Sequence, residues 1–184
     1  MTQMDIEEAR AFAKERCRKD TTYRHLVSVE GVMRGLARHF GEDEGLWALT
    51  GLFHDLDQDI TGHDLERHAR LAAEWLREAD VDERVVNGVL AHSFSENRTD
   101  RMSKAVVHAD AVAGLLVAAA LVRPEHSAGM KVSSVKKKLK EKAFAPGVNR
   151  EEILDVEDSI GITVDELIAS GIEGLQQVAP DIGL

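Results

Sequence analysis

The sequence predicts an all-α protein that folds as a single-domain helical bundle. Apolar residues recur at spacings of three and four along most of the 184-residue chain, which is the period of a helix with one buried face. No alternating run is long enough for a convincing strand, and no Pro-, Gly- or Ser-rich linker separates domains. We therefore expect one domain over residues 1–184, with a core at about residues 23–121 and a C-terminal helical extension at about residues 132–180.

The composition is that of an ordinary soluble globular protein, with 43% hydrophobic and 30% charged residues. A net charge of -10 argues against general nucleic-acid binding, which depends on a broad basic surface. Cys17 is the single cysteine, which excludes an intrachain disulfide and favours the reducing cytoplasm. The first residues lack the pattern of a secretory signal, and polar residues interrupt the apolar stretch at 105–122, so we expect no membrane segment.

Capping residues mark the starts of five successive helices. Asp5 and Glu8 form a capping-box pattern that opens a helix to about residue 18. Thr22 can cap a second helix over 23–40, whose apolar residues form one stripe. Three aspartates then occupy N-cap positions before helices over about 43–54, 64–79 and 82–92, namely Asp43, Asp64 and Asp82.

The later helices differ from one another in character. A helix from about residue 103 to 121 is apolar nearly all round, which predicts that it is the central buried helix. Ser133 or Ser134 starts a lysine-rich helix, and Pro146-Gly147 breaks the chain after it. Asn149 can cap a helix that carries apolar residues as far as residue 160. Thr163 and Glu166 form a second capping box before the last helix.

His54 and Asp55 stand side by side at the polar end of the apolar third helix. Neutral imidazole nitrogen and carboxylate oxygen form a mixed ligand set suited to divalent zinc, iron, manganese or cobalt. Further candidate ligands stand on other predicted helices, at an end or on an inward face: His25, His68, His92 and Asp110.

Asp110 is the most informative of these candidates, because it lies among apolar neighbours in the predicted central helix. An isolated carboxylate there would lose several kcal/mol of hydration free energy, unless a metal or a cationic partner compensates it. An arginine such as Arg24 or Arg101 is the alternative partner. Each histidine taken alone is also compatible with a hydrogen-bonded core or surface role. His63 is a candidate for contacting one of the metal-binding side chains rather than the metal itself.

The order His25, His54-Asp55, Asp110 on an all-helical chain resembles the HD domain superfamily of metal-dependent phosphohydrolases. The resemblance implies that these four residues hold one metal. In relatives with two metals, further histidines follow the His-Asp pair, and His68 and His92 stand in those places, with Asp55 bridging the ions. The segments 68–76 and 89–92 also resemble the family, and the later chain resembles a small prokaryotic branch of it.

Two differences from the family pattern narrow the expectations. Many relatives carry Gly and Lys shortly after the pair, where this chain has Asp57 and Gln58, so a phosphate contact from that position is not expected. The Gly-Tyr-Pro motif of cyclic-dinucleotide phosphodiesterases is also missing from the sequence, so that substrate is not supported.

The activity implied is hydrolysis of a small phosphorylated compound, with a nucleotide as a candidate, by water activated on one or two divalent ions (Fe, Mn, Zn, Co or Mg). Asp55 and Asp57 are the expected catalytic residues, with Asp59 as an alternative to Asp57. A non-catalytic metal- or ligand-binding module is the alternative function, and a homodimer through the apolar last helix is possible. The candidates for binding the substrate phosphate are Arg98, Arg101, Arg123 and Lys131.

Overall fold

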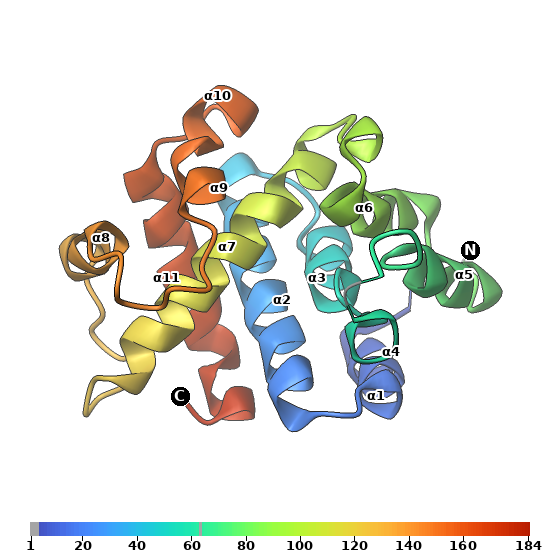
Figure 1. Cartoon of the computed structure of the whole chain (residues 1–184), viewed down its shortest axis with the longest axis horizontal. Coiled ribbons are helices and arrows are strands. Elements are labelled where there is room, and N and C mark those ends of the chain that lie inside the picture. The colour runs from blue at the N-terminus through green and yellow to red at the C-terminus, as the bar shows by residue number, and fades with distance from the viewer. Residues whose placement is uncertain (1–3, 63) are drawn as a thin grey trace.

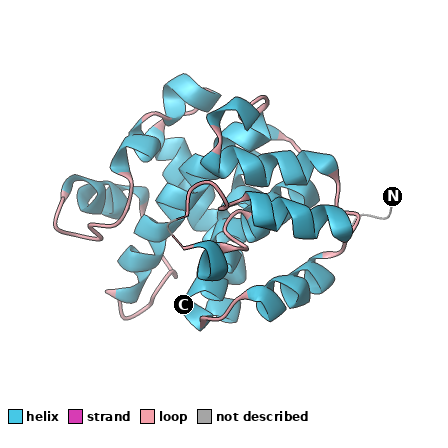
Figure 2. Cartoon of the chain, turned by 45° about the vertical axis from the view of Figure 1, so that its right-hand side comes forward, coloured by secondary structure: helices cyan, strands magenta, loops and turns pink. Residues whose placement is uncertain are grey.

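The described part of the chain is helical, as the sequence predicts. The computed structural model describes residues 4–62 and 64–184. Within these ranges helices alternate with turns and loops, and no strand is present (Figure 2). In chain order the elements are α1 (Ile6–Arg16), α2 (Asp20–Phe40), α3 (Glu44–Phe53), α4 (Gln58–Thr61), α5 (Arg70–Glu78), α6 (Glu83–Ser93), the 3-10 helix η1 (Ser95–Asn97), α7 (Arg101–Leu121), α8 (Val132–Lys140), α9 (Arg150–Leu154), α10 (Val156–Ile160) and α11 (Val164–Ile182).

Helix α2 forms the centre of the bundle. It packs along α3 on one side and α11 on the other, while α7 crosses both α2 and α11 (Figure 1). Its predicted apolar stripe is fully buried at Leu26, Val29, Met33 and Leu36, whereas Phe40 at the end of the stripe is partly buried. Burying such side chains stabilises the fold by about 1.5–3 kcal/mol each. The packing of α2 therefore fixes the position of every side chain it carries.

Glycines allow α2 and α11 to approach each other closely. A Cβ atom on Gly174 would lie 1.9 Å from the carbonyl oxygen of Gly31, and one on Gly35 would lie 2.1 Å from that of Ser170. Any side chain at these positions would push the two helices apart. This contact joins the C-terminal helix to the helix that carries His25.

Helix α7 is the second core helix. Most of its residues are buried, including Val106, Val112 and Leu116. Among the described helices it alone is long and apolar enough to cross a membrane, but 67% of its most apolar window is buried inside the protein. That degree of burial is the one expected of a core helix.

Several predicted helix starts are confirmed by the structure. The side chains of Asp5, Asp43, Asp82 and Asn149 each accept a hydrogen bond from the first turn of the following helix. Thr163 and Glu166 form the predicted reciprocal capping box at the start of α11.

Other predicted boundaries are wrong. Helix α2 begins at Asp20 rather than beside Thr22, whose hydroxyl instead donates to Asp59 at 2.8 Å. Helix α7 begins at Arg101 because Asp100 caps it, with Ser103 as the reciprocal partner. Helix α8 begins at Val132, ahead of the two serines. The helix expected after Asn149 is two short helices, since Asp155 separates α9 from α10.

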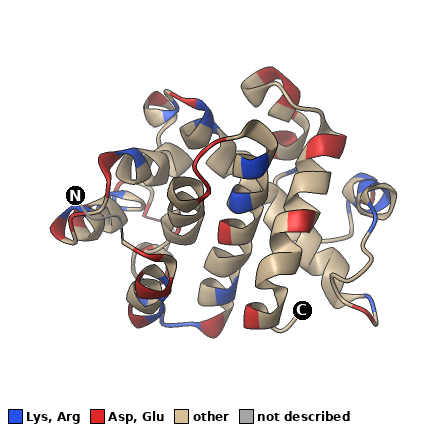
Figure 3. Cartoon of the chain, turned by 180° about the vertical axis from the view of Figure 1, so that it is seen from behind, with Lys and Arg blue, Asp and Glu red and all other residues tan. Residues whose placement is uncertain are grey.

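Lysines cover the outer side of α8 at the edge of the molecule (Figure 3). Lys137 and Lys140 are exposed, and Lys136 pairs with Asp165 of α11 at 2.6 Å. These lysines therefore form a solvated basic face.

Candidate metal centre

Four helices carry or end beside five of the six predicted ligands. His25 lies in the second turn of α2, and Asp110 lies near the middle of α7. His54 is the residue that ends α3, directly before Asp55, and His92 lies in the last turn of α6. Because these helices pack against one another around α2 and α7, their side chains meet at one place.

The sixth candidate, His68, does not lie on a helix as predicted. Residues 65–69 form turns, and Ala69 has a left-handed backbone with φ 64°, which ends any helix that would start at Asp64. Helix α5 therefore begins at Arg70. Asp57, far from it in sequence, accepts a hydrogen bond from the Ala72 N–H at 3.0 Å and so caps α5. His68 is nevertheless buried, as expected.

Asp110 contacts three histidines. Its Oδ1 lies 3.0 Å from His25 Nε2 and 3.7 Å from His54 Nε2. Its Oδ2 lies 3.3 Å from His92 Nε2. Its partners are thus imidazoles, and the suggested alternatives Arg24 and Arg101 pair instead with Asp20 and Glu42. The expectation of full burial is wrong, because 32% of the Asp110 side chain is exposed.

Asp55 joins two groups of histidines. Its Oδ2 lies 3.6 Å from His54 Nε2, and its Oδ1 lies 3.1 Å from His68 Nε2 and 3.3 Å from His92 Nδ1. Asp55 Oδ1 and His92 Nδ1 are both buried without a hydrogen-bond partner of good geometry. Buried polar atoms without partners are rare in native proteins. A shared cation would satisfy both atoms.

Hydrogen bonds to the far side of two rings fix which nitrogen faces the centre. His54 Nδ1 lies 2.8 Å from the carbonyl oxygen of Gly51, which can only accept, so this nitrogen carries the proton. In the neutral ring, the lone pair of Nε2 then faces His25 Nε2, only 3.2 Å away. His68 Nδ1 likewise donates to Asp57 Oδ1 at 2.8 Å. Partners of this kind orient histidine ligands in metal sites.

The donor set therefore fits a divalent metal. Ligand atoms of His25, His54 and Asp110 lie within 4.8 Å of one another, and so do those of His54, Asp55 and His92. Donors about 2.0–2.2 Å from a common ion lie about 3–4 Å apart, so small adjustments are enough to close either group around an ion. His68 is the sixth member of the same cluster, because its Nε2 lies 3.1 Å from Asp55 Oδ1.

The carboxylates and imidazoles shift one another's pKa values. Burial opposes ionisation of Asp110, but hydrogen bonds to His25 and His92 and the nearby His54 ring hold its pKa well below its usual value. Burial also opposes protonation of His68, but Asp55 and Asp57 raise its pKa to about 10. The pKa values of His25 and His92 are raised for the same reason. Without metal, protons on the histidines balance the acidic charge.

The metal-free protein is therefore expected to lose stability as the pH rises. The His68 pKa is about 10 in the folded protein and about 6.5 when unfolded, so its contribution is complete below about pH 6.5 and is lost by about pH 10. Urea unfolding with a chelator present should show a free energy of unfolding that falls over this range. The fall should be smaller in His68→Gln, and equal falls in both proteins would contradict the expectation.

The remaining acidic candidates contact protein groups. Asp57 is fully buried against His68 and Ala72, which favours a positioning role, and a catalytic role for it stays a prediction. Asp59 accepts from the backbone N–H groups of Arg18 and Lys19, so it holds the α1–α2 connection. His63 lies outside the described residues.

The four basic candidates do not gather at the centre. Arg101 begins α7, nine residues before Asp110, so it lies about 13 Å away along the helix axis. Arg123 donates to the carbonyls of His126 and Ala128, and Lys131 is the residue before α8. Arg98 is nearer, since it donates to the carbonyl of Ala91 beside His92. Phosphate binding by any of them stays a prediction.

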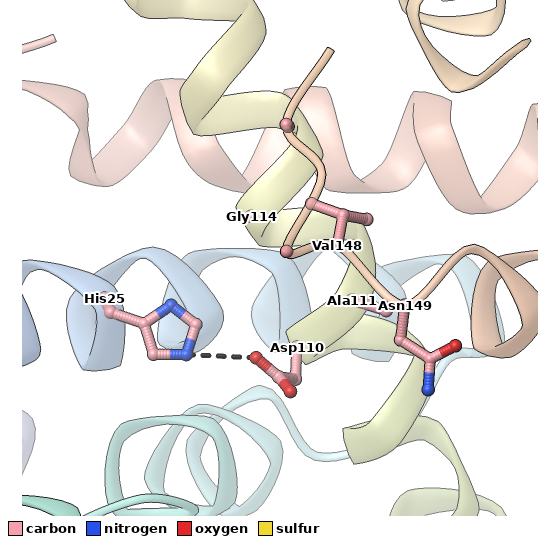
Figure 4. A pocket seen from close by; sticks show the side chains of 8 residues that line it. His25, Asp110, Ala111, Gly114, Val148 and Asn149 are labelled. Atoms are coloured by element: carbon pink, nitrogen blue, oxygen red, sulfur yellow. Dashed lines mark ion pairs between the residues drawn. The ribbon is translucent and has the colours of Figure 1, made fainter. Parts of the chain in front are cut away.

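Two cavities adjoin the centre, and both include His25 and Gly114 in their walls. The inner cavity, of about 320 Å³, also contains Asp110 and is bordered on one side by the loop at 145–149 (Figure 4). The outer cavity, of about 300 Å³, lies between α2, α7 and the C-terminus. Sequence reasoning missed these walls, because the residues after 121 reach the centre only through the tertiary fold. The described lining residues beyond the two ligands are Ala111, Ala145, Gly147, Val148 and Asn149 in the inner cavity, and Thr21, Arg24, Ser28, Val117, Leu121, Ile182 and Leu184 in the outer one.

The histidines and aspartates of this helical bundle converge beside an open cavity. This arrangement places the chain in the class of helical proteins with a candidate metal site. Comparison with protein families matches the HD domain to residues 22–120, more than half of the chain. The chain therefore belongs to the HD domain family, and this resemblance is confirmed.

Among curated proteins, the chain is similar to Ribonuclease Y 2 of Levilactobacillus brevis, with 29% identity over 91 residues. The similarity covers 49% of this chain and 17% of that relative. The chain thus spans only a small part of the length of the curated relative that it matches. No solved structure gives a significant match.

Proposed function

We propose that this protein is a metal-dependent phosphohydrolase that acts on a small phosphorylated compound, with nucleotides as the first candidates. The main support is that two candidate ligands, His25 and Asp110, line an open cavity. A structural metal site is closed by protein groups, whereas a catalytic one keeps room for water and substrate. This openness favours catalysis over a non-catalytic metal- or ligand-binding module. Membership of the HD domain family, whose members are generally metal-dependent hydrolases, points the same way.

Asp55 is the central residue of the proposal. Its two oxygens face different histidines, Oδ2 toward His54 and Oδ1 toward His68 and His92. This placement suits a carboxylate that bridges two ions. We therefore propose a centre for one or two ions among Fe, Mn, Zn, Co and Mg, with His25, His54, Asp55 and Asp110 at the first position and His68 and His92 at the second.

Bound divalent metal would supply an acidified water and positive charge beside the phosphoryl oxygens. Hydrolysis breaks the ester P–O bond and forms a P–O bond to the oxygen of water, releasing an alcohol and phosphate. The chain's own task is to hold the ligands in place. The Gly51 carbonyl orients His54, and Asp57 orients His68. Such outer partners typically change metal affinity or activity by about 10–100-fold when removed.

The test is an assay of the protein loaded with each of these metals. The panel contains nucleoside mono-, di- and triphosphates and simple phosphomonoesters. It also contains a short RNA, because the matched relative is named a ribonuclease. We expect metal-dependent hydrolysis of at least one compound, and we expect Asp55→Ala to abolish it. Asp158→Ala is the control and should keep the activity, because Asp158 is an exposed residue of α10. Equal turnover by the wild type and Asp55→Ala would reject the proposal.

A further inference from the structure

The two cavities beside the metal centre share His25 and Gly114 in their walls, so they adjoin each other, and we call them together the cleft. The inner cavity contains the ligand Asp110 and the outer one does not. Gly114 lies one helical turn after Asp110, and residues four apart share a face of a helix. The face of α7 that holds the ligand Asp110 therefore continues to Gly114, where the two cavities adjoin.

The outer cavity is an apolar surface. Its hydrocarbon wall comes from α7 and the end of the chain, and two of the polar side chains in it, Ser28 and Arg24, already have partners. The Ser28 hydroxyl donates to the His25 carbonyl at 2.7 Å, and the Arg24 guanidinium contacts Asp20 at 2.7 Å. Leu121 is 62% exposed, so it offers apolar surface that a ligand would cover. The apolar lining residues are Val117, Leu121, Ile182 and Leu184.

The cleft carries little positive charge beyond the centre. Arg24 is the only lysine or arginine among the described residues that line either cavity, and Asp20 already pairs with it. The net charge of the chain is -10. A second or third phosphate group in the cleft would therefore lack a counter-charge. An uncharged leaving group would not need one.

The space between Gly114 and Val148 is narrow, and its Val148 side is held firmly. A Cβ atom on Gly114 would lie 3.4 Å from Val148 Cγ2, so a larger side chain would fill the gap. The loop that carries Val148 is fixed by Arg150, whose guanidinium donates to carbonyls of this loop, of the preceding segment and of the end of α8. These are the carbonyls of Leu139, Glu141, Phe144, Ala145 and Val148.

From this geometry we propose that the substrate is a phosphomonoester whose leaving group is uncharged and ends in an apolar part. The phosphoryl group lies in the inner cavity beside His25 and Asp110, and the leaving group passes Gly114 into the outer cavity. This inference rests on the proposed function, because it concerns the substrate of the same centre.

The test is calorimetric binding of alkylphosphonates, from methyl- to hexylphosphonate, to the metal-loaded protein. The carbon–phosphorus bond resists hydrolysis, so the readout is affinity alone. We expect affinity to rise roughly fourfold for each methylene that enters the outer cavity. Gly114→Leu should remove this rise by blocking the passage. Leu121→Asn should weaken hexylphosphonate binding roughly tenfold by removing apolar surface. This second variant provides the test if Gly114→Leu does not fold.

Leu154→Asn is the matched control, because Leu154 is 60% exposed and lines neither cavity. It should keep the full dependence on chain length. Two results would overturn the cleft proposal: a wild-type affinity that does not change with alkyl chain length, or an equal loss of affinity in Leu121→Asn and Leu154→Asn. Either result would leave the proposed function standing if phosphoesters were hydrolysed. A rise with chain length, without hydrolysis of hexyl phosphate or any other ester, would support the cleft while rejecting the hydrolase.

Discussion

Replacing Asp110 by asparagine is expected to remove metal from the purified protein and to reduce phosphoester hydrolysis roughly a thousandfold. Among the acidic residues that the structure describes, Asp110 alone contacts His25, His54 and His92, through both of its oxygens. The amide keeps the shape of the side chain but loses the negative charge that attracts a cation. The loss of about 4 kcal/mol of charge stabilisation in the transition state corresponds to roughly a thousandfold in rate.

Elemental analysis and steady-state kinetics measure the two effects separately. Asp165→Asn is the control, because this exposed aspartate lies on α11 and pairs with Lys136 on the surface. It should keep both metal and activity. Full metal content together with full activity in Asp110→Asn would show that the shared carboxylate is not a ligand, and the proposed first metal position would be wrong.

Replacing Gly174 by alanine is expected to destabilise the fold by about 3 kcal/mol, at the upper end for overpacking. The new Cβ would lie 1.9 Å from the carbonyl oxygen of Gly31, so α11 must move away from α2. That movement would also loosen the outer cavity, which both helices line through Arg24 and Ile182. Urea unfolding followed by circular dichroism measures the loss.

Gly114→Ala is the matched control for this change. It is the same substitution inside another long helix, but the new Cβ meets only Val148 Cγ2 at 3.4 Å. Alanine favours the helix over glycine by about 1 kcal/mol, so this variant should be as stable as the wild type or slightly more stable. Equal stability of Gly174→Ala and the wild type would contradict the close crossing of α2 and α11.

Local patterns predict much of this structure. Periodic apolar residues identify the long helices, and short polar side chains before them identify most of the starts, as at Asp43 and Asp82. Local patterns did not predict a helix start where the group that caps the helix is distant in sequence. Helix α5 has no side-chain cap of its own and is capped by Asp57, so its start could not be found from the residues beside it.

The candidate site shows the same division. Residue types and their order along the chain predicted which imidazoles and carboxylates to consider, and the structure brings all six within one cluster, although metal binding by them stays a prediction. The surroundings of the cluster were not predicted. Of the basic residues proposed for phosphate binding, Arg98 lies near the cluster, where it donates to the Ala91 carbonyl, whereas Arg101 lies farther away and pairs with Glu42.

By itself, the sequence determined that the chain is helical, which faces of the helices are apolar, and which side chains are chemically able to bind a metal. These properties depend on residue type and on spacing within one helix. The tertiary structure decided that Asp57 orients His68, that Val148 and Ile182 line the cleft, and that Gly31 meets Gly174. Such contacts join segments far apart in the chain, and they follow from how whole helices pack, which no local pattern specifies.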